Sequence, residues 1–144
     1  MTESRHLSVH IDRPVTEVYA FASDPANLPR WAPGLGSAIT RVGERWVVET
    51  SEGQVQLTFA PPNQYGVLDH HVVTSSGETV YVPLRAIADG DATEVVFTLR
   101  RAPGMTDDEF ERDTALVAGD LARLRSVLEG AQVGSSEDVR DRDA

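Results

Sequence analysis

Residues 106–129 constrain the fold most, because they predict one long helix with a single apolar face. Thr106 stands at the expected N-cap, and Glu109 follows three residues later, which is the spacing of a capping box. The expected buried stripe comprises Phe110, Thr114, Val117, Leu121, Leu124 and Leu128, with Leu116 and Val127 at its flank. Gly130 is the expected end of the helix. A helix of roughly 35 Å with one apolar side needs a partner of similar length, which favours a sheet.

Length and composition predict one globular domain over residues 1–130, followed by a disordered acidic tail at 131–144. The chain has 144 residues, of which 40% are hydrophobic and 25% are charged, as in ordinary globular domains. No apolar run approaches the length of a membrane span, so we expect none. The first residues lack the basic-then-apolar pattern of a leader, and a cytoplasmic location is therefore the expectation.

The charged residues exclude several function classes. A net charge of −10 argues against a nucleic-acid partner, because neutralising phosphates needs a basic face. The chain has no cysteine, which removes disulfides, thiolate nucleophiles and cysteine-ligated metals. It also has no lysine, which removes Schiff-base and phosphate-loop lysines. No cofactor is expected.

The order of elements predicts an α+β fold. Strands are expected at 6–11, 37–42, 45–50, 54–60, 65–74, 79–88 and 93–101, with short helices at 14–23 and 26–31. Short links rich in Gly, Asp and Asn join the six later strands, which is typical of hairpins. The result is one seven-stranded antiparallel sheet, in the order β-α-α-β6-α, packed on the C-terminal helix.

Alternation along two strands predicts which side chains face the core. In 65–74 we expect Leu68, His70 and Val72 to point inward, because the opposite choice would bury an unpaired Asp69. In 79–88 the inward set is Val80, Val82, Leu84 and Ala86. Tyr81 and Arg85 are then surface residues. They would offer a phenol and a cation to the interior only if the face of this strand were reversed.

Short sequence phrases add a resemblance to a known superfamily. The phrases are Ile11-Asp12-Arg13-Pro14, Val18-Tyr19-Ala20-Phe21, Asp24-Pro25, Arg30-Trp31, Gly66-Val67-Leu68-Asp69-His70 and Glu94-Val95-Val96-Phe97-Thr98-Leu99. Over residues 5–130 the chain resembles the START/Bet v 1-like (SRPBCC) superfamily, and its small bacterial polyketide cyclase/dehydrase-like members in particular. The resemblance implies a helix-grip fold, in which a curved sheet encloses a cavity under the C-terminal helix. Members bind lipids, sterols, polyketides or hormones, some close aromatic rings, and others are co-chaperones.

His70 is the candidate acid–base residue. Burial would lower its pKa and keep the ring neutral, so that it could donate one hydrogen bond and accept another. A metal site is not expected, because the adjacent His70 and His71 point to opposite faces of a strand. His6 and His10 are about 13 Å apart on an extended strand, which is too far to share an ion.

Three hypotheses of function follow. The first is binding of a small apolar molecule in a cavity lined by Trp31, Trp46, Phe59, Leu68, His70, Leu84, Phe97, Val117 and Leu121. The second is a polyketide cyclase or dehydratase in which His70 moves protons. The third is a protein-interaction module whose cavity is filled by its own side chains. The sequence leaves the oligomeric state open between monomer and homodimer.

Overall fold

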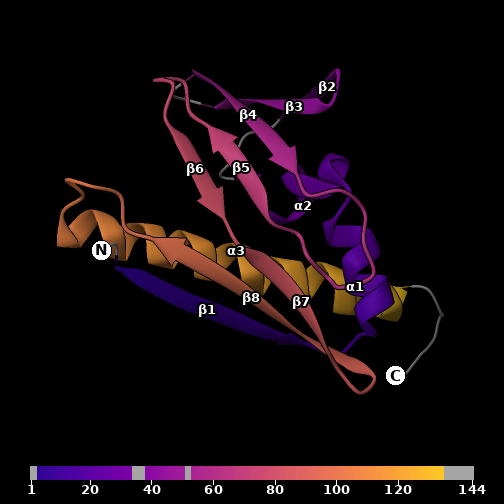
Figure 1. The fold of residues 1–144 in the computed structure, drawn as a ribbon. Helices are drawn as coiled ribbons and strands as arrows, with labels where there is room; N and C mark the ends of the chain where they lie inside the picture. Colours follow the sequence, from indigo (N-terminus) through magenta and orange to yellow (C-terminus); the bar gives the residue numbers. More distant parts are fainter. Residues whose placement is uncertain (1–2, 34–37, 51–52, 135–144) are drawn as a thin grey trace.

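The computed structural model describes residues 3–33, 38–50 and 53–134, which form strands, short helices and one long helix (Figure 1). In chain order the elements are β1 (Ser4–Ile11), α1 (Val15–Ala22), the 3₁₀ helix η1 (Pro25–Asn27), α2 (Leu28–Trp31), β2 (Ala38–Val42), β3 (Arg45–Thr50), β4 (Gly53–Phe59), β5 (His70–Val73), β6 (Thr79–Val82), β7 (Leu84–Asp89), β8 (Ala92–Arg100) and α3 (Asp107–Gly134).

The strands form two antiparallel sheets. One sheet has the order β1-β8-β7, and the other has the order β2-β3-β4-β5-β6. In Figure 1, α3 runs along the three-stranded sheet, while the five-stranded sheet rises away from it. The chain crosses from one sheet to the other between β6 and β7. The α+β class and the long C-terminal helix are as expected, but a single seven-stranded sheet is not what forms.

Pro83 explains why one expected strand is two. The expected strand 79–88 divides into β6 and β7 on either side of this proline. Proline has no N–H to donate to a sheet ladder and is therefore poorly tolerated inside a continuous strand. β6 pairs with β5, β7 pairs with β8, and the carbonyl of Pro83 accepts a hydrogen bond from the Thr98 N–H at 3.0 Å. The described residues thus contain eight strands.

The expected strand 65–74 is regular only from His70 onward. Before it, the side chain of Asn63 organises an irregular segment. Its Oδ1 accepts hydrogen bonds from the Tyr65 and Val67 N–H groups at 2.9 and 3.0 Å. Gly66 has a φ of +72°, and a Cβ at this position would lie 2.0 Å from the carbonyl oxygen of Ala86. Only glycine allows this approach between the segment and β7.

The inward faces are mostly as expected. Leu68, Leu84 and Ala86 are buried. Val80 is the exception, because 40% of its surface is exposed. It lies on β6, which is the edge strand of the five-stranded sheet, and there the core no longer covers the inward face. Alternation gives the face of a residue, but it does not say whether anything packs on that face at that point of the strand.

The helix α3 begins at the expected capping box. Oγ1 of Thr106 accepts a hydrogen bond from the Glu109 N–H at 3.1 Å, and Oε1 of Glu109 accepts one from the Thr106 N–H at 2.9 Å. Four members of the expected stripe are buried: Phe110, Leu121, Leu124 and Leu128. The helix continues through Gly130 to Gly134 instead of ending at Gly130, since an interior glycine costs only about 1 kcal/mol. Residues 135–144 of the expected tail lie outside the described residues.

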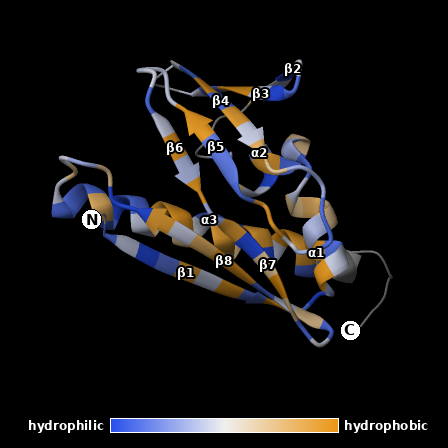
Figure 2. Cartoon of the chain, in the orientation of Figure 1, coloured by the Kyte–Doolittle hydropathy of each residue, from blue (hydrophilic) through white to orange (hydrophobic). Residues whose placement is uncertain are grey.

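The core lies between α3 and the strands, and α1 and α2 close one end of it. Figure 2 shows apolar residues along α3, β7 and β8, alternating with polar ones. Val18 of α1 and Trp31 of α2 belong to the same buried cluster as Leu121 and Leu124 of α3. Arg123 of α3 also donates a hydrogen bond to the carbonyl oxygen of Trp31 at 3.3 Å. These contacts fix α2 against α3 at the position where the cavity described below begins.

Candidate functional site

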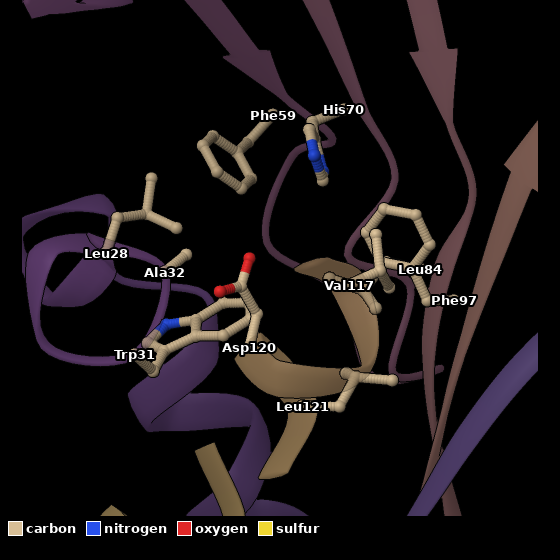
Figure 3. A pocket seen from close by; sticks show the side chains of 10 residues that line it. All are labelled: Leu28, Trp31, Ala32, Phe59, His70, Leu84, Phe97, Val117, Asp120 and Leu121. Atoms are coloured by element: carbon tan, nitrogen blue, oxygen red, sulfur yellow. The ribbon is translucent and has the colours of Figure 1, made fainter. Parts of the chain in front are cut away.

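A small chamber of about 40 Å³ lies between α2, α3 and the strands (Figure 3). Its walls come from all the packed layers of the molecule, and most of them are apolar. The lining residues are Leu28, Trp31, Ala32, Phe59, His70, Leu84, Phe97, Val117, Asp120 and Leu121. This volume holds a water molecule or one small functional group of a ligand, but not a whole ligand.

A wider, partly open cleft of about 260 Å³ adjoins the chamber. It lies between α3 and the strands β5, β6 and β8. Its lining residues are His70, Val72, Val82, Phe97, Leu99, Asp113, Leu116, Val117 and Asp120. His70, Phe97, Val117 and Asp120 line both spaces, so the chamber and the cleft adjoin at these side chains.

His70, the first residue of β5, presents one free ring nitrogen to the chamber. Its Nδ1 lies 3.1 Å from the carbonyl oxygen of Leu68, which can only accept, so Nδ1 carries the proton. Nε2 is then an acceptor. The ring packs on Phe59 with 5.0 Å between the ring centroids. Burial lowers the pKa of His70 below its ordinary value, against a smaller opposing effect of the hydrogen bond to Leu68. The ring is therefore neutral at pH 7, as the sequence predicts.

Asp120 places a carboxylate from α3 at the same chamber, and Figure 3 shows it pointing into the space between Trp31 and Phe59. Its Oδ1 accepts a hydrogen bond from Arg123 at 3.1 Å. Burial raises the pKa of Asp120, although the guanidinium of Arg123 opposes the shift. The sequence analysis missed this residue. Its position in the sequence could have identified it. Asp120 follows Val117 by three residues and precedes Leu121 by one, so it lies at the edge of the buried stripe.

Asp113 lies two helical turns before Asp120 and lines the outer cleft. Within the described part of the chain, its carboxylate has no hydrogen bond or ion pair. Burial raises the pKa of Asp113, and the nearby Glu109 adds to this effect while Arg112 opposes it. The cleft thus contains a partly buried carboxylate without a partner.

Trp31 contributes the one unpaired donor of the chamber. The residue is only 5% exposed, and its Nε1–H has no hydrogen-bond partner among the described residues. Figure 3 shows the indole nitrogen on the edge of the ring turned toward Ala32. A buried N–H without a partner costs about 1–3 kcal/mol, so this group would gain from an acceptor that enters the chamber.

Comparison with known proteins supplies the family. The sequence profile of the family described as polyketide cyclase/dehydrase and lipid transport matches residues 3–129. The chain belongs to this family. The resemblance to the START/Bet v 1-like superfamily that the sequence indicates is thereby confirmed. No curated protein matches the sequence significantly.

Solved structures with the same fold include proteins of different kinds. An uncharacterised protein from Bacillus thuringiensis is 10% identical, with a TM-score of 0.72 over 88% of this chain and 99% of its own. DynU16, from the dynemicin biosynthetic locus, is 20% identical with a TM-score of 0.67; the match covers 89% of this chain and 48% of DynU16. Norcoclaurine synthase from Thalictrum flavum is 12% identical, with a TM-score of 0.63 over 89% of this chain and 94% of its own. At these identities the likeness shows the shared fold alone.

The structure brings most of the expected cavity residues together. Those that line the chamber are Trp31, Phe59, His70, Leu84, Phe97, Val117 and Leu121. Leu68 and Trp46 do not line it. Leu68 is buried in the core, and Trp46, on β3, is partly buried and packs against the core without reaching the chamber. Alternation placed both on the inward face, but it could not give their position along the curved sheet.

The burial of Asp69 contradicts the expectation that only Leu68, His70 and Val72 of this segment point away from solvent. Asp69 is buried, with 7% of its surface exposed, and its carboxylate accepts four hydrogen bonds. The Leu84 N–H and Arg85 Nε bind Oδ1 at 2.9 and 2.8 Å, while Arg85 Nη2 at 2.7 Å and the Tyr81 hydroxyl bind Oδ2. The bonds from Arg85, above all, hold the pKa of Asp69 well below its usual range. Tyr81 and Arg85, expected as plain surface residues, are the partners that make this burial possible.

Within residues 3–33, 38–50 and 53–134, no three His, Asp or Glu side chains are grouped closely enough to hold a metal ion. In the same part of the chain, no helix is long and apolar enough to cross a membrane.

Proposed function

We propose that this protein binds a small hydrophobic molecule, such as a polyketide, a lipid or an aromatic compound, between the strands and α3. The observation that carries the proposal is that the chamber and the outer cleft adjoin, with His70, Phe97, Val117 and Asp120 lining both. The cleft of about 260 Å³ is near the lower end of the range for ligand pockets, roughly 300–1,000 Å³, so the ligand should be compact. The open cleft of about 260 Å³ favours ligand binding over the interaction module, which predicts a cavity filled by side chains.

The polar groups of the chamber would orient such a ligand. Nε2 of His70 can accept a hydrogen bond, and the buried Nε1–H of Trp31 can donate one. A ligand hydroxyl does both, because it donates to one partner and accepts from another. The apolar body of the ligand would then lie in the outer cleft against Phe97 and Val117. A few polar groups in an apolar pocket are the usual source of orientation.

A titration followed by NMR tests the proposal. Aromatic polyketides, flavonoids and fatty acids are added to the isotope-labelled protein, and at least one class should shift the signals of the Trp31 indole N–H, Val117 and Leu121. Val117→Trp should abolish these shifts, because the larger side chain fills the junction of chamber and cleft. The matched control is Ile87→Trp, at a position on β7 that is 51% exposed, and it should bind as the wild type does. If no compound shifts the cleft signals, the proposal is wrong.

Catalysis of a ring closure is the second candidate, and the neutral His70 at the chamber favours it. Nε2 would take a proton from a carbon between two carbonyl groups, and the resulting carbanion would attack a further carbonyl of the same substrate. The imidazolium would return the proton to the new alkoxide, and loss of water would complete the cyclisation. In the same titration, a polyketide that binds should also turn over, and His70→Gln should keep binding but lose turnover. Unchanged turnover in His70→Ala would exclude this role.

A further inference from the structure

The charged residues that line the outer cleft are acidic. Asp113 and Asp120 both come from α3, and they are separated by about 10 Å along the helix axis. The third titratable group of the cleft, His70, is neutral at pH 7 because of its burial. Among the described residues, no arginine lines either the chamber or the cleft. A hydrophobic cleft therefore has a negative wall.

Neither carboxylate is fully neutralised by the protein. Asp113 has no hydrogen bond or ion pair within the described residues. The side chain of Asp120 is 28% exposed. Within the described residues its only partner is Arg123, which donates a hydrogen bond to Oδ1, so Oδ2 has no hydrogen bond in that part of the chain. Burial raises the pKa of both groups, as it does when a carboxylate loses water without gaining a sufficient cation. These carboxylates would gain from a positive group placed in the cleft.

Most hydrogen-bonding groups of the site are acceptors, which also favours a ligand that donates. His70 Nε2 and the oxygens of Asp113 and Asp120 can only accept when the carboxyls are ionised. Among the described side chains that line the two spaces, the single donor is the buried Nε1–H of Trp31, which has no partner in that part of the chain. That orphan donor is an independent sign that a ligand completes the chamber, because a native protein rarely leaves such a group unpaired. A ligand that matches the remaining groups must bring N–H or O–H donors with it.

We propose that the cleft selects small apolar ligands that carry a protonated amine, with the ammonium group at the carboxylate of Asp113 in the outer cleft. This inference rests on the proposed ligand-binding function and narrows its ligand class. An ammonium would form a charge-assisted hydrogen bond with Asp113, while the apolar body packs on Phe97 and Val117. Asp120, about 10 Å further along the helix, adds to the negative potential of the cleft. The net charge of −10 also concentrates cations near the protein and repels anions. Fatty acids are accordingly poor candidates.

Three matched probes test the inference on the full chain. 2-Phenylethylamine, 2-phenylethanol and 3-phenylpropanoate share an aromatic body but are positive, neutral and negative at pH 7. Dissociation constants are measured by NMR titration at low salt, from the shifts at Trp31 and Val117. The amine should bind about tenfold more tightly than the alcohol, as expected for one added charge-assisted hydrogen bond, and the carboxylate should bind most weakly.

Two variants test whether Asp113 and Asp120 produce the preference for the amine. Asp113→Asn should reduce the preference for the amine over the alcohol, measured within the variant as the ratio of the two dissociation constants, to about threefold or less. Asp120→Asn should reduce this ratio by a smaller factor, because its carboxylate acts on the ammonium only at a distance. The matched control is Glu44→Gln, which removes the same charge from an exposed residue between β2 and β3 and should keep the tenfold preference.

The outcomes separate this inference from the proposed function. If the amine and the alcohol bind equally at the cleft, the protein binds small apolar molecules but the amine preference is wrong. An amine preference that survives both variants also overturns the inference, because the charge would then act from elsewhere. If none of the three probes shifts the cleft signals, the inference is wrong, and the proposed function then depends on the neutral polyketides and flavonoids of the larger panel.

Discussion

At the scale of single residues, the carboxylate of Asp69 joins the two sheets. It precedes β5 of the five-stranded sheet, and it binds Leu84 and Arg85 of β7 in the three-stranded sheet. The hydroxyl of Tyr81 on β6 completes the set. All three partner residues flank the break at Pro83, where no ladder of backbone hydrogen bonds links β6 to β7. The carboxylate therefore replaces part of the pairing that the break removes.

Asp69→Asn should lower the free energy of unfolding by about 1–2 kcal/mol at pH 7, because the buried carboxylate loses acceptor sites for its hydrogen bonds and its charge. The ion pair contributes less than a buried one would, since the Arg85 side chain is 48% exposed. The bonds from Arg85 lower the pKa of Asp69 in the folded state below the unfolded value of about 3.9. Its contribution is therefore present above pH ~4 and is lost as the pH falls below that value. Urea unfolding at pH 7 and pH 3 should show a large difference between wild type and variant at pH 7 and a smaller one at pH 3.

Asp91→Asn is the matched control, since Asp91 is exposed in the turn between β7 and β8. It should change the stability by no more than about 0.5 kcal/mol at either pH. Equal effects of the two substitutions would show that the Asp69 cluster does not stabilise the fold.

The same residues show what could be predicted at this scale. The neutral state of His70 followed from its inward position among apolar neighbours, which alternation along one strand supplies. Asp69 was misplaced because its burial was judged without partners, and those partners lie on β6 and β7, 12 and 16 residues further along the chain. Asp120 was missed because the helical stripe was read only for apolar residues. Pairing across elements is a tertiary property, and no local pattern contains it.

At the scale of elements, local signals were sufficient for α3 but not for the sheets. The capping box and the buried stripe of α3 depend on residues three or four apart, so the sequence predicts them well. The number of strands depends on which segments pair. Pro83 was visible in the sequence, and its missing N–H was the available sign that the strand 79–88 would divide. The approach of Gly66 to Ala86 brings the irregular segment before β5 against β7, and no local signal describes such a contact.

Gly119 of α3 allows a test of whether the helix must flex to admit a ligand. It precedes Asp120, and a Cβ added there would have no atom within 4 Å. Gly119→Ala should therefore raise the free energy of unfolding by up to about 1 kcal/mol, because alanine favours the helix. If the helix lifts at this point, the stiffer variant should also exchange ligand more slowly. Ligand exchange rates from NMR line shapes provide the measurement.

Ala122→Gly is the matched opposite, at an exposed position three residues further along α3. It should lower stability by about 1 kcal/mol and speed exchange. Equal exchange rates in wild type and both variants would show that ligand entry does not involve bending of α3, even if the stabilities change as expected.

At the scale of the whole molecule, α3 serves both the fold and the proposed site. One face of the helix carries the buried stripe that packs in the core. Asp113 and Asp120 lie at the edge of that stripe and line the cleft. The chain already has a net charge of −10, so further carboxylates placed at a partly buried position oppose folding. Stability and ligand selection thus compete along the same helix. The fold was predictable because many local patterns agree on it, whereas this competition depends on where α3 meets the second sheet.

The cost of the Asp113 charge to folding can be measured. Burial and the charge of Glu109 raise the pKa of Asp113, so its ionised form destabilises the folded state, and this penalty disappears as the pH falls through the folded-state pKa. Asp113→Asn should therefore raise the free energy of unfolding by about 0.5 kcal/mol at pH 7, the size of one repulsive i, i+4 pair, and have no effect at pH 3. Urea unfolding of wild type and variant at both pH values measures this. A variant that is more stable but has lost its preference for the amine would show that Asp113 serves ligand selection at a cost in stability. A variant that is less stable at pH 7 would show instead that Asp113 contributes to the fold.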